Sequence, residues 1–419
     1  MAWIDNLFKM MTEKKASDLH MTSEHIPMIR ESGDMIQLQG VPKLSRDQMM
    51  QILMEICPER NKQQFEETWD TDFAYALEGC GRFRSNYFID RNGIGAVFRR
   101  IPDKILSAEQ LGLPPAILKL CEFKKGLVLV TGPTGSGKST TLAAMMDYIN
   151  STRKEHIITI EDPVEFVHPA KMCLVNQREI HQTTKSFAAA LRAALREDPD
   201  IVLVGEMRDL ETTRIAIETA ETGHLVFGTL HTSTASSTVD RIINQFPSNE
   251  QEQIRLMLAG SLRGVVAQNL MKRKGGGRVA AQEILFVTPG IAANIREGKT
   301  YQIPSAMQTG ARYGMCLLND ALERLVKSDT VEPMEAYDRS IDKEDMAKKL
   351  KALGFDVEAH QAAATSKPAP APAAASAPAP NAGSPQQGAW VVKPKDPAQA
   401  QSAQASNNPP GVNWKRPNG

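Results

Sequence analysis

The chain has 419 residues, enough for two domains with extensions, and its 42% hydrophobic content allows a large buried core. Its formal net charge is zero, but five basic residues and one acidic residue follow residue 360, so the preceding body has a net charge of −4. A mildly acidic body offers no general attraction to nucleic acid, and we expect no nucleic-acid partner.

Cysteine usage and apolar runs bear on the cellular compartment. The five cysteines are scattered and none forms a CxxC pair, which predicts neither a zinc module nor a disulfide framework and favours a reducing cytoplasm. The N-terminus lacks the pattern of a signal peptide, and no apolar run approaches the roughly 20 residues of a membrane span. We therefore expect a cytoplasmic protein that is not inserted in the membrane and reaches it by docking onto other proteins.

The first hundred residues have the pattern of a small α+β domain, bounded here as 1–101. Apolar positions recur at helical spacing first, and alternating apolar and polar residues then predict strands. The first expected element is an amphipathic helix over 3–11. Its polar face is not rich in Lys or Arg, which favours packing against its own domain; adsorption to a membrane is the alternative. A hairpin within 27–40, helical structure over 44–68, and strands within 71–101 separated by turns at Gly79–Gly81 and Asn92-Gly93 follow.

After a proline-punctuated linker at 102–123, strands and helices alternate over 124–290. The strands are nearly continuous apolar runs, such as "GLVLV" and "DIVLVG", which are typical of a parallel sheet covered on both faces. The predicted fold class is therefore α/β with a doubly wound parallel sheet. Residues 291–353 are expected to be helical. From about residue 361 the sequence is rich in Ala and Pro and cannot bury enough surface to fold, and we predict that 354–419 is a disordered tail.

A glycine-rich loop between a predicted strand and a predicted helix fits the phosphate-binding pattern GxxxxGK[ST]. Its glycines let backbone N–H groups point at phosphate oxygens, its lysine places a cation between the β- and γ-phosphates, and its serine offers a hydroxyl to Mg²⁺. The pattern predicts a nucleoside triphosphate site with Mg²⁺. The expected binding residues are Gly132, Pro133, Thr134, Gly135, Ser136, Gly137, Lys138, Ser139 and Thr140.

A second buried strand ends in "VLVGEMRD". In a common Walker B strand the last residue is an aspartate, but Gly205 takes that place and Glu206 follows. A carboxylate one residue beyond the strand suits polarisation of the attacking water, and we assign Glu206 this role. The alternative is that Glu206 caps the helix that opens near Arg208.

Because the aspartate is missing, the metal needs another acid in its outer shell. Glu161, Asp162 and Glu165 come directly after another apolar strand, where side chains converge on the ligand crevice of a doubly wound sheet. We predict that Ser139, Glu161 and Glu206 serve the Mg²⁺ ion, partly through water, with Glu161 also a catalytic residue. A solvated acidic turn is the alternative for these acids.

Two histidines, His224 and His231, flank one predicted strand. They are seven residues apart, so they cannot both ligate one metal directly. Both are candidate catalytic residues that hydrogen-bond the γ-phosphate or its sensing network, with Thr229 and Thr232 nearby. The alternative is that they are satisfied core histidines.

In order and spacing, the phosphate loop, "ITIEDPVEF", "LREDPDIVLVGEMRDLET" and "AETGHLVFGTLHT" resemble the Walker A, Asp box, Walker B and His box of the secretion ATPases. "SDLH", "GRFRSNYF" and "VFRRIP" add a resemblance to the PilT-like retraction ATPases of the type IV pilus. The resemblance covers about residues 1–353. Residues 290–299 and 314–317 depart from the pattern of this family.

The resemblance implies a homohexameric ring whose subunits have a PAS-like N-terminal domain and a RecA-like domain, with ATP bound between them. The ring would sit peripherally at the inner membrane under the pilus machine. ATP hydrolysis would turn an inner-membrane platform protein, retract the pilus and drive twitching motility. A second retraction ATPase is a further candidate partner.

Arginines of the N-terminal region are candidates for neutralising charge on the γ-phosphate, because that charge needs cations beyond the loop lysine. Arg82 and Arg84 share one strand face, whereas Arg99 and Arg100 point to opposite faces, so at most one of the second pair joins the first. The family likeness favours Arg84 and Arg99 as arginine fingers.

Alternative functions remain open at this stage. Within the superfamily they are an accessory PilU-like retraction ATPase and a pilus assembly or type II secretion ATPase, although the latter generally carry a tetracysteine zinc module. From other classes they are a RecA-like nucleic-acid motor, which would need a basic channel and stacking aromatics, and a regulator that binds nucleotide without cleaving it.

Overall fold

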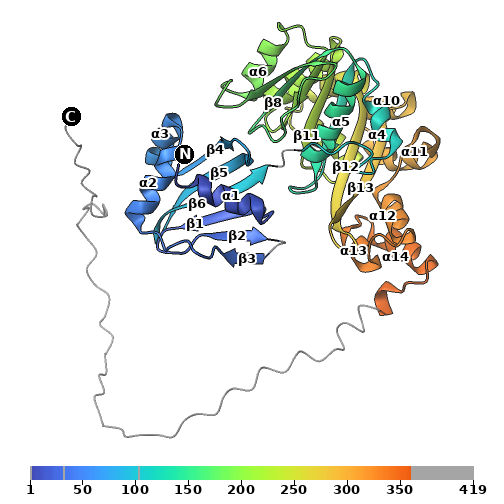
Figure 1. The fold of residues 1–419 in the computed structure, drawn as a ribbon. Helices are drawn as coiled ribbons and strands as arrows, with labels where there is room; N and C mark the ends of the chain where they lie inside the picture. The colour runs from blue at the N-terminus through green and yellow to red at the C-terminus, as the bar shows by residue number, and fades with distance from the viewer. Residues whose placement is uncertain (1, 32–33, 102–103, 360–419) are drawn as a thin grey trace, which may run out of the picture. The chain divides into compact units, whose positions relative to one another are not determined.

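The structure, a computed structural model, describes residues 2–31, 34–101 and 104–359 (Figure 1). The described residues belong to one compact unit. The predicted tail lies outside the described residues from residue 360 onward, and the predicted domain boundaries remain predictions. Among the described residues, no helix combines the length and apolar character needed to cross a bilayer.

The N-terminal part is built around a six-stranded antiparallel sheet of order β3-β2-β1-β6-β5-β4. The predicted hairpins are confirmed, and the expected helical stretch divides into two helices because Pro58 ends the first and opens the second. The elements are α1 (Asp5–Glu13), β1 (Asp18–Thr22), β2 (Met28–Glu31), β3 (Asp34–Gln37), α2 (Arg46–Ile56), α3 (Glu59–Thr68), β4 (Asp70–Leu77), β5 (Gly81–Asp90) and β6 (Gly93–Ile101).

The amphipathic N-terminal helix packs on this sheet, as predicted. Leu7, Phe8 and Met11 of α1 are buried, and the ring of Phe8 stacks on that of Phe83 with centroids 4.2 Å apart. Full burial of one such side chain contributes about 1.5–3 kcal/mol to folding.

The second sheet has seven strands in the order β13-β12-β7-β11-β10-β8-β9. Neighbouring strands are parallel, as predicted for a doubly wound parallel sheet, except that the edge strand β13 runs antiparallel to β12. A two-strand hairpin at the edge needs no crossover helix, and its antiparallel direction follows from its short turn. The strands are β7 (Gly126–Thr131), β8 (His156–Glu161), β9 (Leu174–Glu179), β10 (Ile201–Val204), β11 (Leu225–Leu230), β12 (Leu262–Lys272) and β13 (Arg278–Phe286).

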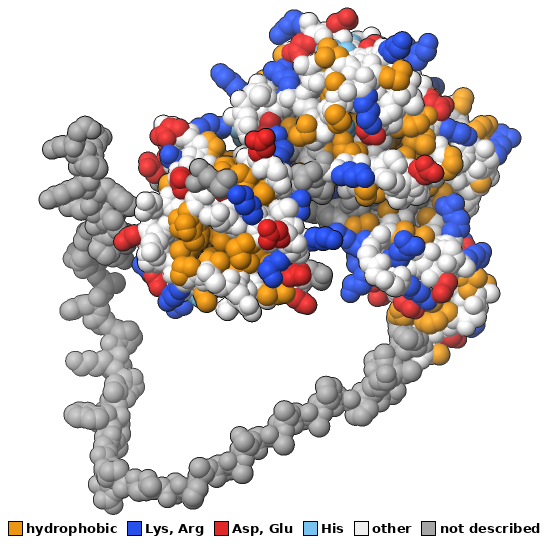
Figure 2. Space-filling model, viewed as in Figure 1, with side chains coloured by type: hydrophobic (Ala, Val, Ile, Leu, Met, Phe, Trp, Pro, Cys, Tyr) orange, Lys and Arg blue, Asp and Glu red, His pale blue; other side chains and the backbone are white. Residues whose placement is uncertain are grey.

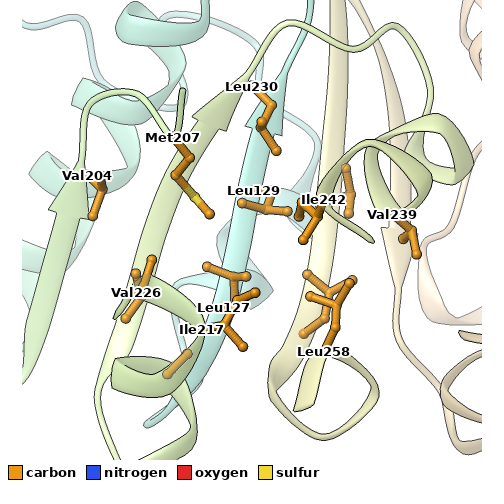
Figure 3. Packing of buried hydrophobic residues seen from close by; sticks show 14 of the residues in the cluster. Leu127, Leu129, Val204, Met207, Ile217, Val226, Leu230, Val239, Ile242 and Leu258 are labelled. Carbon is orange, nitrogen blue, oxygen red and sulfur yellow. The ribbon is translucent and has the colours of Figure 1, made fainter. Parts of the chain in front are cut away.

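Helices cover this sheet on its two faces, which is why its central strands are apolar throughout. Leu127 and Leu129 of β7 pack with Ile217, Ile242 and Leu258 from three helices (Figure 3). The helices of this region are α4 (Pro115–Leu120), α5 (Lys138–Thr152), α6 (Phe187–Ala194), α7 (Leu210–Glu221), α8 (Ala235–Asn244) and α9 (Gln251–Ser261).

The remaining described residues are mainly helical, as predicted for 291–353. Helices α12–α14 share a hydrophobic cluster of their own, which also includes Met271 of β12. The elements are α10 (Pro289–Arg296), α11 (Ile303–Thr309), α12 (Leu318–Lys327), α13 (Pro333–Arg339) and α14 (Lys343–Ala352), with short 3₁₀ turns at Thr300–Gln302 and Ala311–Tyr313.

Candidate active site

The phosphate loop joins the end of β7 to the start of α5, as its sequence predicts. Gly132, Gly135 and Gly137 have φ angles of 143°, 77° and 86°, in the region that L side chains rarely adopt. At Gly132 a Cβ atom would also lie 2.2 Å from the backbone oxygen of Gln268. The loop therefore depends on glycine for both its backbone conformation and its close contact with β12.

Lys138 begins α5, a helix of 15 residues whose N-terminal N–H groups favour an anion. Its Nζ donates to the carbonyl oxygens of Gly132, at 2.9 Å, and Pro133, at 3.2 Å. Burial lowers the pKa of Lys138, while the carboxylates of Glu206 and Glu165 oppose that shift. The lysine is thus a cation held at the loop and within electrostatic reach of the acids expected across the site.

Glu206 and His231 follow the ends of the adjacent parallel strands β10 and β11. His231 Nε2 lies 2.8 Å from Glu206 Oε1, and Arg208 also pairs with this oxygen. Burial acts to raise the pKa of Glu206, but the bonds from Arg208 and His231 outweigh it and hold the pKa below its usual value. Asp209 is the N-cap of α7, so the alternative role of Glu206 as the cap is wrong.

Glu161 ends β8, the strand beside β10, and its carboxylate is held by three donors. It accepts from Thr159 Oγ1 at 2.6 Å, Gln177 Nε2 at 3.2 Å and the backbone N–H of Glu165 at 3.3 Å. Burial nevertheless raises the pKa of Glu161. A Cβ atom on Gly205 would lie 3.3 Å from Glu161 Cα, so glycine at the usual aspartate position leaves room for this acid.

These groups line one cleft of about 680 Å³. It contains predicted site residues from the phosphate loop, the acidic segment after β8 and the ends of β10 and β11, together with one of the arginine candidates. Those lining residues are Thr134, Gly135, Lys138, Ser139, Glu161, Asp162, Glu165, Glu206, Thr229, His231 and Arg84. The carboxyl ends of the parallel strands therefore converge as the doubly wound pattern predicts.

His224 occupies a different position. It precedes β11, whereas His231 follows it, so the two histidines lie at opposite ends of the strand. His224 Nδ1 lies 3.2 Å from the backbone oxygen of Thr219. The described chain does not bring His224 to the cleft of its own subunit, and its catalytic role remains a prediction.

Register settles which arginines share a face. Arg84 of β5 is directly opposite Arg99 of β6, so these two lie on one side of the sheet and Arg100 on the other. Arg84 Nε lies 3.8 Å from Asp72, and Arg99 Nε lies 2.8 Å from Asp18. Their roles as arginine fingers remain predictions.

Sequence reasoning missed two glutamines that hold the site in place. Gln268 is 3% exposed; its Nε2 donates to Ser136 O at 2.7 Å, and its Oε1 accepts from Thr141 Oγ1 at 2.8 Å. Gln177 bonds Glu161 and also the backbone of the segment after β8. Gln268 could have been noticed as a polar residue near the end of an apolar strand. Gln177 offered no such signal, because β9, which carries it, lacks an apolar run.

The oxygen donors of the cleft fit Mg²⁺ better than a soft metal. The Ser139 hydroxyl and the carboxylates of Glu161 and Glu206 are hard ligands. In the part of the chain that the structure describes, no group of three or more His, Cys, Asp or Glu side chains forms a ready metal cage. Mg²⁺ usually keeps several waters and binds through one or two carboxylates and substrate phosphates, so these oxygen donors fit it.

Residues 2–344 match the family model described as type II/IV secretion system protein. The chain is 50% identical over 337 residues to the "Type IV pilus retractation ATPase PilT" of Pseudomonas aeruginosa, covering 80% of this chain and 98% of that protein. It is 36% identical over 364 residues to the "Type IV pilus ATPase PilU" of the same organism, covering 87% of this chain and 95% of PilU.

A solved structure of the pilus retraction motor PilT with bound ADP has the same fold. It matches with a TM-score of 0.77 and 46% identity, covering 82% of this chain and 98% of that one. The predicted α/β fold class is confirmed. The chain therefore belongs to the type II/IV secretion system protein family, as a PilT-like secretion ATPase.

Proposed function

We propose that this protein hydrolyses ATP and that, as a homohexamer, it powers retraction of type IV pili. The observation that carries the proposal is the convergence of Lys138, Glu161, Glu206 and His231 on one cleft beside the phosphate loop. The alignment with PilT, at 50% identity, covers 98% of that protein's length. PilU is less similar to this chain, at 36% identity. These findings favour a primary retraction motor over an accessory PilU-like one.

The loop and the helix start bind the triphosphate. Backbone N–H groups of the loop and the N-terminus of α5 face anionic oxygens, and Lys138 exchanges its bonds to loop carbonyls for phosphate oxygens. Because the lysine is partly desolvated before nucleotide arrives, its charge acts in a medium that screens it less than bulk water does.

Glu206 acts as the base that orients and deprotonates the attacking water. Its carboxylate is an acceptor, so His231 must carry its proton on Nε2 and donate it. His231 and Arg208 fix the carboxylate and keep it ionised, because they lower its pKa. A positioned base of this kind contributes about 10²–10⁴-fold to the rate.

Mg²⁺ would be held by the Ser139 hydroxyl and, partly through water, by Glu161 and Glu206. When bound, the ion would neutralise charge on the β- and γ-phosphates. The raised pKa of Glu161 reflects a buried carboxylate that lacks a full complement of positive charge, and a cation there would relieve this burial cost.

The charge distribution agrees with a protein partner better than with nucleic acid. On the face shown in Figure 2, the Lys and Arg side chains of the described residues are interspersed with Asp and Glu instead of forming one basic stripe. We propose an inner-membrane pilus platform protein as the partner that receives the work. The motor would then lie in the cytoplasm, peripheral to the inner membrane.

Deleting the gene and imaging pili tests the direction of force. Hyperpiliated cells that do not twitch, rescued by the wild-type gene but not by a Glu206→Gln gene, are the expected result. Bald cells would indicate pilus assembly and contradict retraction. Normal pili and normal twitching would contradict a role in this machine.

A further inference from the structure

Glu283 is a buried acid that the proposed reaction does not use. It lies on β13 and is 5% exposed. Its two oxygens serve two different helices: Oε1 accepts from the backbone N–H of Ala235 at 2.7 Å, and Oε2 accepts from that of Leu318 at 3.1 Å. Each bond meets the first residue of a helix, where a carboxylate is favoured by unpaired N–H groups and the helix dipole.

The first of these helices, α8, is tied to the nucleotide side of the molecule. It begins four residues after His231 and is capped by Thr234. Thr238 on its first turns lies within hydrogen-bond distance of two hydroxyls, Thr232 Oγ1 at 2.7 Å and Thr131 Oγ1 at 3.4 Å. Thr131 is the last residue of β7, directly before the phosphate loop, so a shift of the His231 segment or of the loop acts on the start of α8.

The second helix, α12, belongs to the separate hydrophobic cluster of α12–α14. Leu318 and Leu322 are buried in that cluster. The segment that leads into α12 also lies along β13, because Cys316 and Ile284 exchange backbone hydrogen bonds at 2.8 and 3.0 Å. The start of α12 is therefore held to the strand that carries Glu283 by backbone and side chain together.

We propose that Glu283 is a positioning residue that couples the His231 segment to the C-terminal helices. One of its carboxylate oxygens accepts a hydrogen bond from the start of α8, and the other accepts one from the start of α12. Movement of the start of α8 then changes the hydrogen bonding available to the start of α12. A buried carboxylate that loses one of two donors has no water to replace it, so the two contacts favour a concerted response. The inference rests on the proposed function, since it needs nucleotide to bind at the phosphate loop.

The test is hydrogen exchange of the Ala235 and Leu318 amides in the full-length protein, with and without the ATP analogue AMP-PNP and Mg²⁺. In the wild-type protein we expect both amides to change exchange rate, by about fivefold or more, in the range of ordinary coupling energies. In Glu283→Gln, an NH₂ group replaces one carboxylate oxygen. This group is itself a donor, so it cannot accept a hydrogen bond from the backbone N–H that it faces. We therefore expect AMP-PNP no longer to change the exchange rate of the Leu318 amide, while α8 still responds.

Two variants sharpen this test. Glu323→Gln is the matched control, because Glu323 lies on α12 but pairs with Lys327 and Lys349 instead of with α8; it should keep the response of Leu318. Ala235→Pro removes the other N–H donor while residue 283 stays glutamate. Proline fits a first helical position, and Thr234 before it already has an extended backbone. Because the ring takes the place of the donated hydrogen, Glu283 Oε1 must also move away from the start of α8. Ala235→Pro should also abolish the response of Leu318.

The outcomes separate this inference from the proposed function. A wild-type protein in which α8 responds to bound AMP-PNP and Leu318 does not would overturn the coupling, and that result needs no variant. A Leu318 response that survives in Glu283→Gln and in Ala235→Pro would overturn it as well. If Glu323→Gln also abolishes the change in the exchange rate of the Leu318 amide, the effect is not specific to Glu283, and its contacts are only structural. If AMP-PNP does not bind at all, both the coupling and the ATP site proposed above fail.

Discussion

His231 Nε2 donates to Glu206 Oε1 across 2.8 Å, from the end of β11 to the end of β10. The bond joins two segments that the sequence separates by 25 residues, and it exists because the strands are parallel neighbours. It also gives His231 a definite chemical task, since a donor on this carboxylate keeps it ionised and fixes its direction.

Replacing His231 by Ala should lower kcat by about 10–100-fold with little change in ATP affinity. One hydrogen bond to a charged group contributes about 1.5–3 kcal/mol, and the base loses its orientation without it. His224→Ala is the comparison, because that histidine lies at the other end of β11. Steady-state kinetics with ATP titrations checks both. An unchanged kcat in His231→Ala would contradict the role of this hydrogen bond in orienting the base.

Gln268→Met should weaken ATP binding about tenfold. The substitution nearly keeps the side-chain volume but removes the bonds to Ser136 O and Thr141 Oγ1, which together hold the phosphate loop. A net loss of about 1–1.5 kcal/mol corresponds to this change in Kd. Nucleotide binding measured by calorimetry tests it. Gln282→Met, which removes a bond to Gln268 but none to the loop, should have the smaller effect.

How far sequence predicts this site differs from residue to residue. The positions of Lys138 and Glu206 follow from strand-and-loop patterns, because a phosphate loop and the end of a buried strand leave local signatures. Gln268 could not be placed in this way, since its role depends on β12 lying beside β7, a contact between residues far apart in the chain. Pairing of distant strands is a property of the tertiary fold.

The same reasoning explains which strands of the sheet the sequence pattern did not reveal. The central strands were recognisable because burial on both faces makes them apolar throughout. β9, with the sequence "LVNQRE", is an edge strand that is partly exposed, so it lacks that pattern. The antiparallel direction of β13 follows from its hairpin with β12, a pairing that a pattern of alternating strands and helices does not indicate.

Gly205→Ala should destabilise the protein by about 1–3 kcal/mol. A Cβ atom there would lie 3.1 Å from Ile160 O and 3.3 Å from Glu161 Cα, so a neighbouring strand must shift. Gly290→Ala is the matched control, since a Cβ atom at Gly290 meets nothing within 4 Å. Denaturant unfolding of both variants checks this. Equal stability of the two would mean that the fit between Gly205 and Glu161 is looser than the structure has it.

Glu161→Gln should stabilise the nucleotide-free protein at neutral pH. Burial raises the pKa of Glu161 in the folded state, so ionisation there opposes folding. This penalty is full above the folded-state pKa, shrinks as the pH falls through it, and vanishes below the ordinary value of 4.5. The glutamine oxygen can keep the bonds from Thr159 and Gln177. The variant therefore loses mainly the longest hydrogen bond, the one from the Glu165 N–H.

The measurement for this variant is thermal unfolding across pH. The variant should unfold at a higher temperature than the wild-type protein at pH 7, and the difference should disappear under acidic conditions. A stability difference of the opposite sign, or one that does not depend on pH, would contradict a buried carboxylate with a raised pKa at this position.

The central claim is that this cleft cleaves ATP with Glu206 as the base, and steady-state ATP turnover of purified wild-type protein and Glu206→Gln tests it most directly. We predict measurable turnover in the wild-type protein and a kcat lower by about 10²–10⁴-fold in the variant, with ATP still bound. Equal rates in the two proteins, or turnover in neither despite bound ATP and Mg²⁺, would contradict the account.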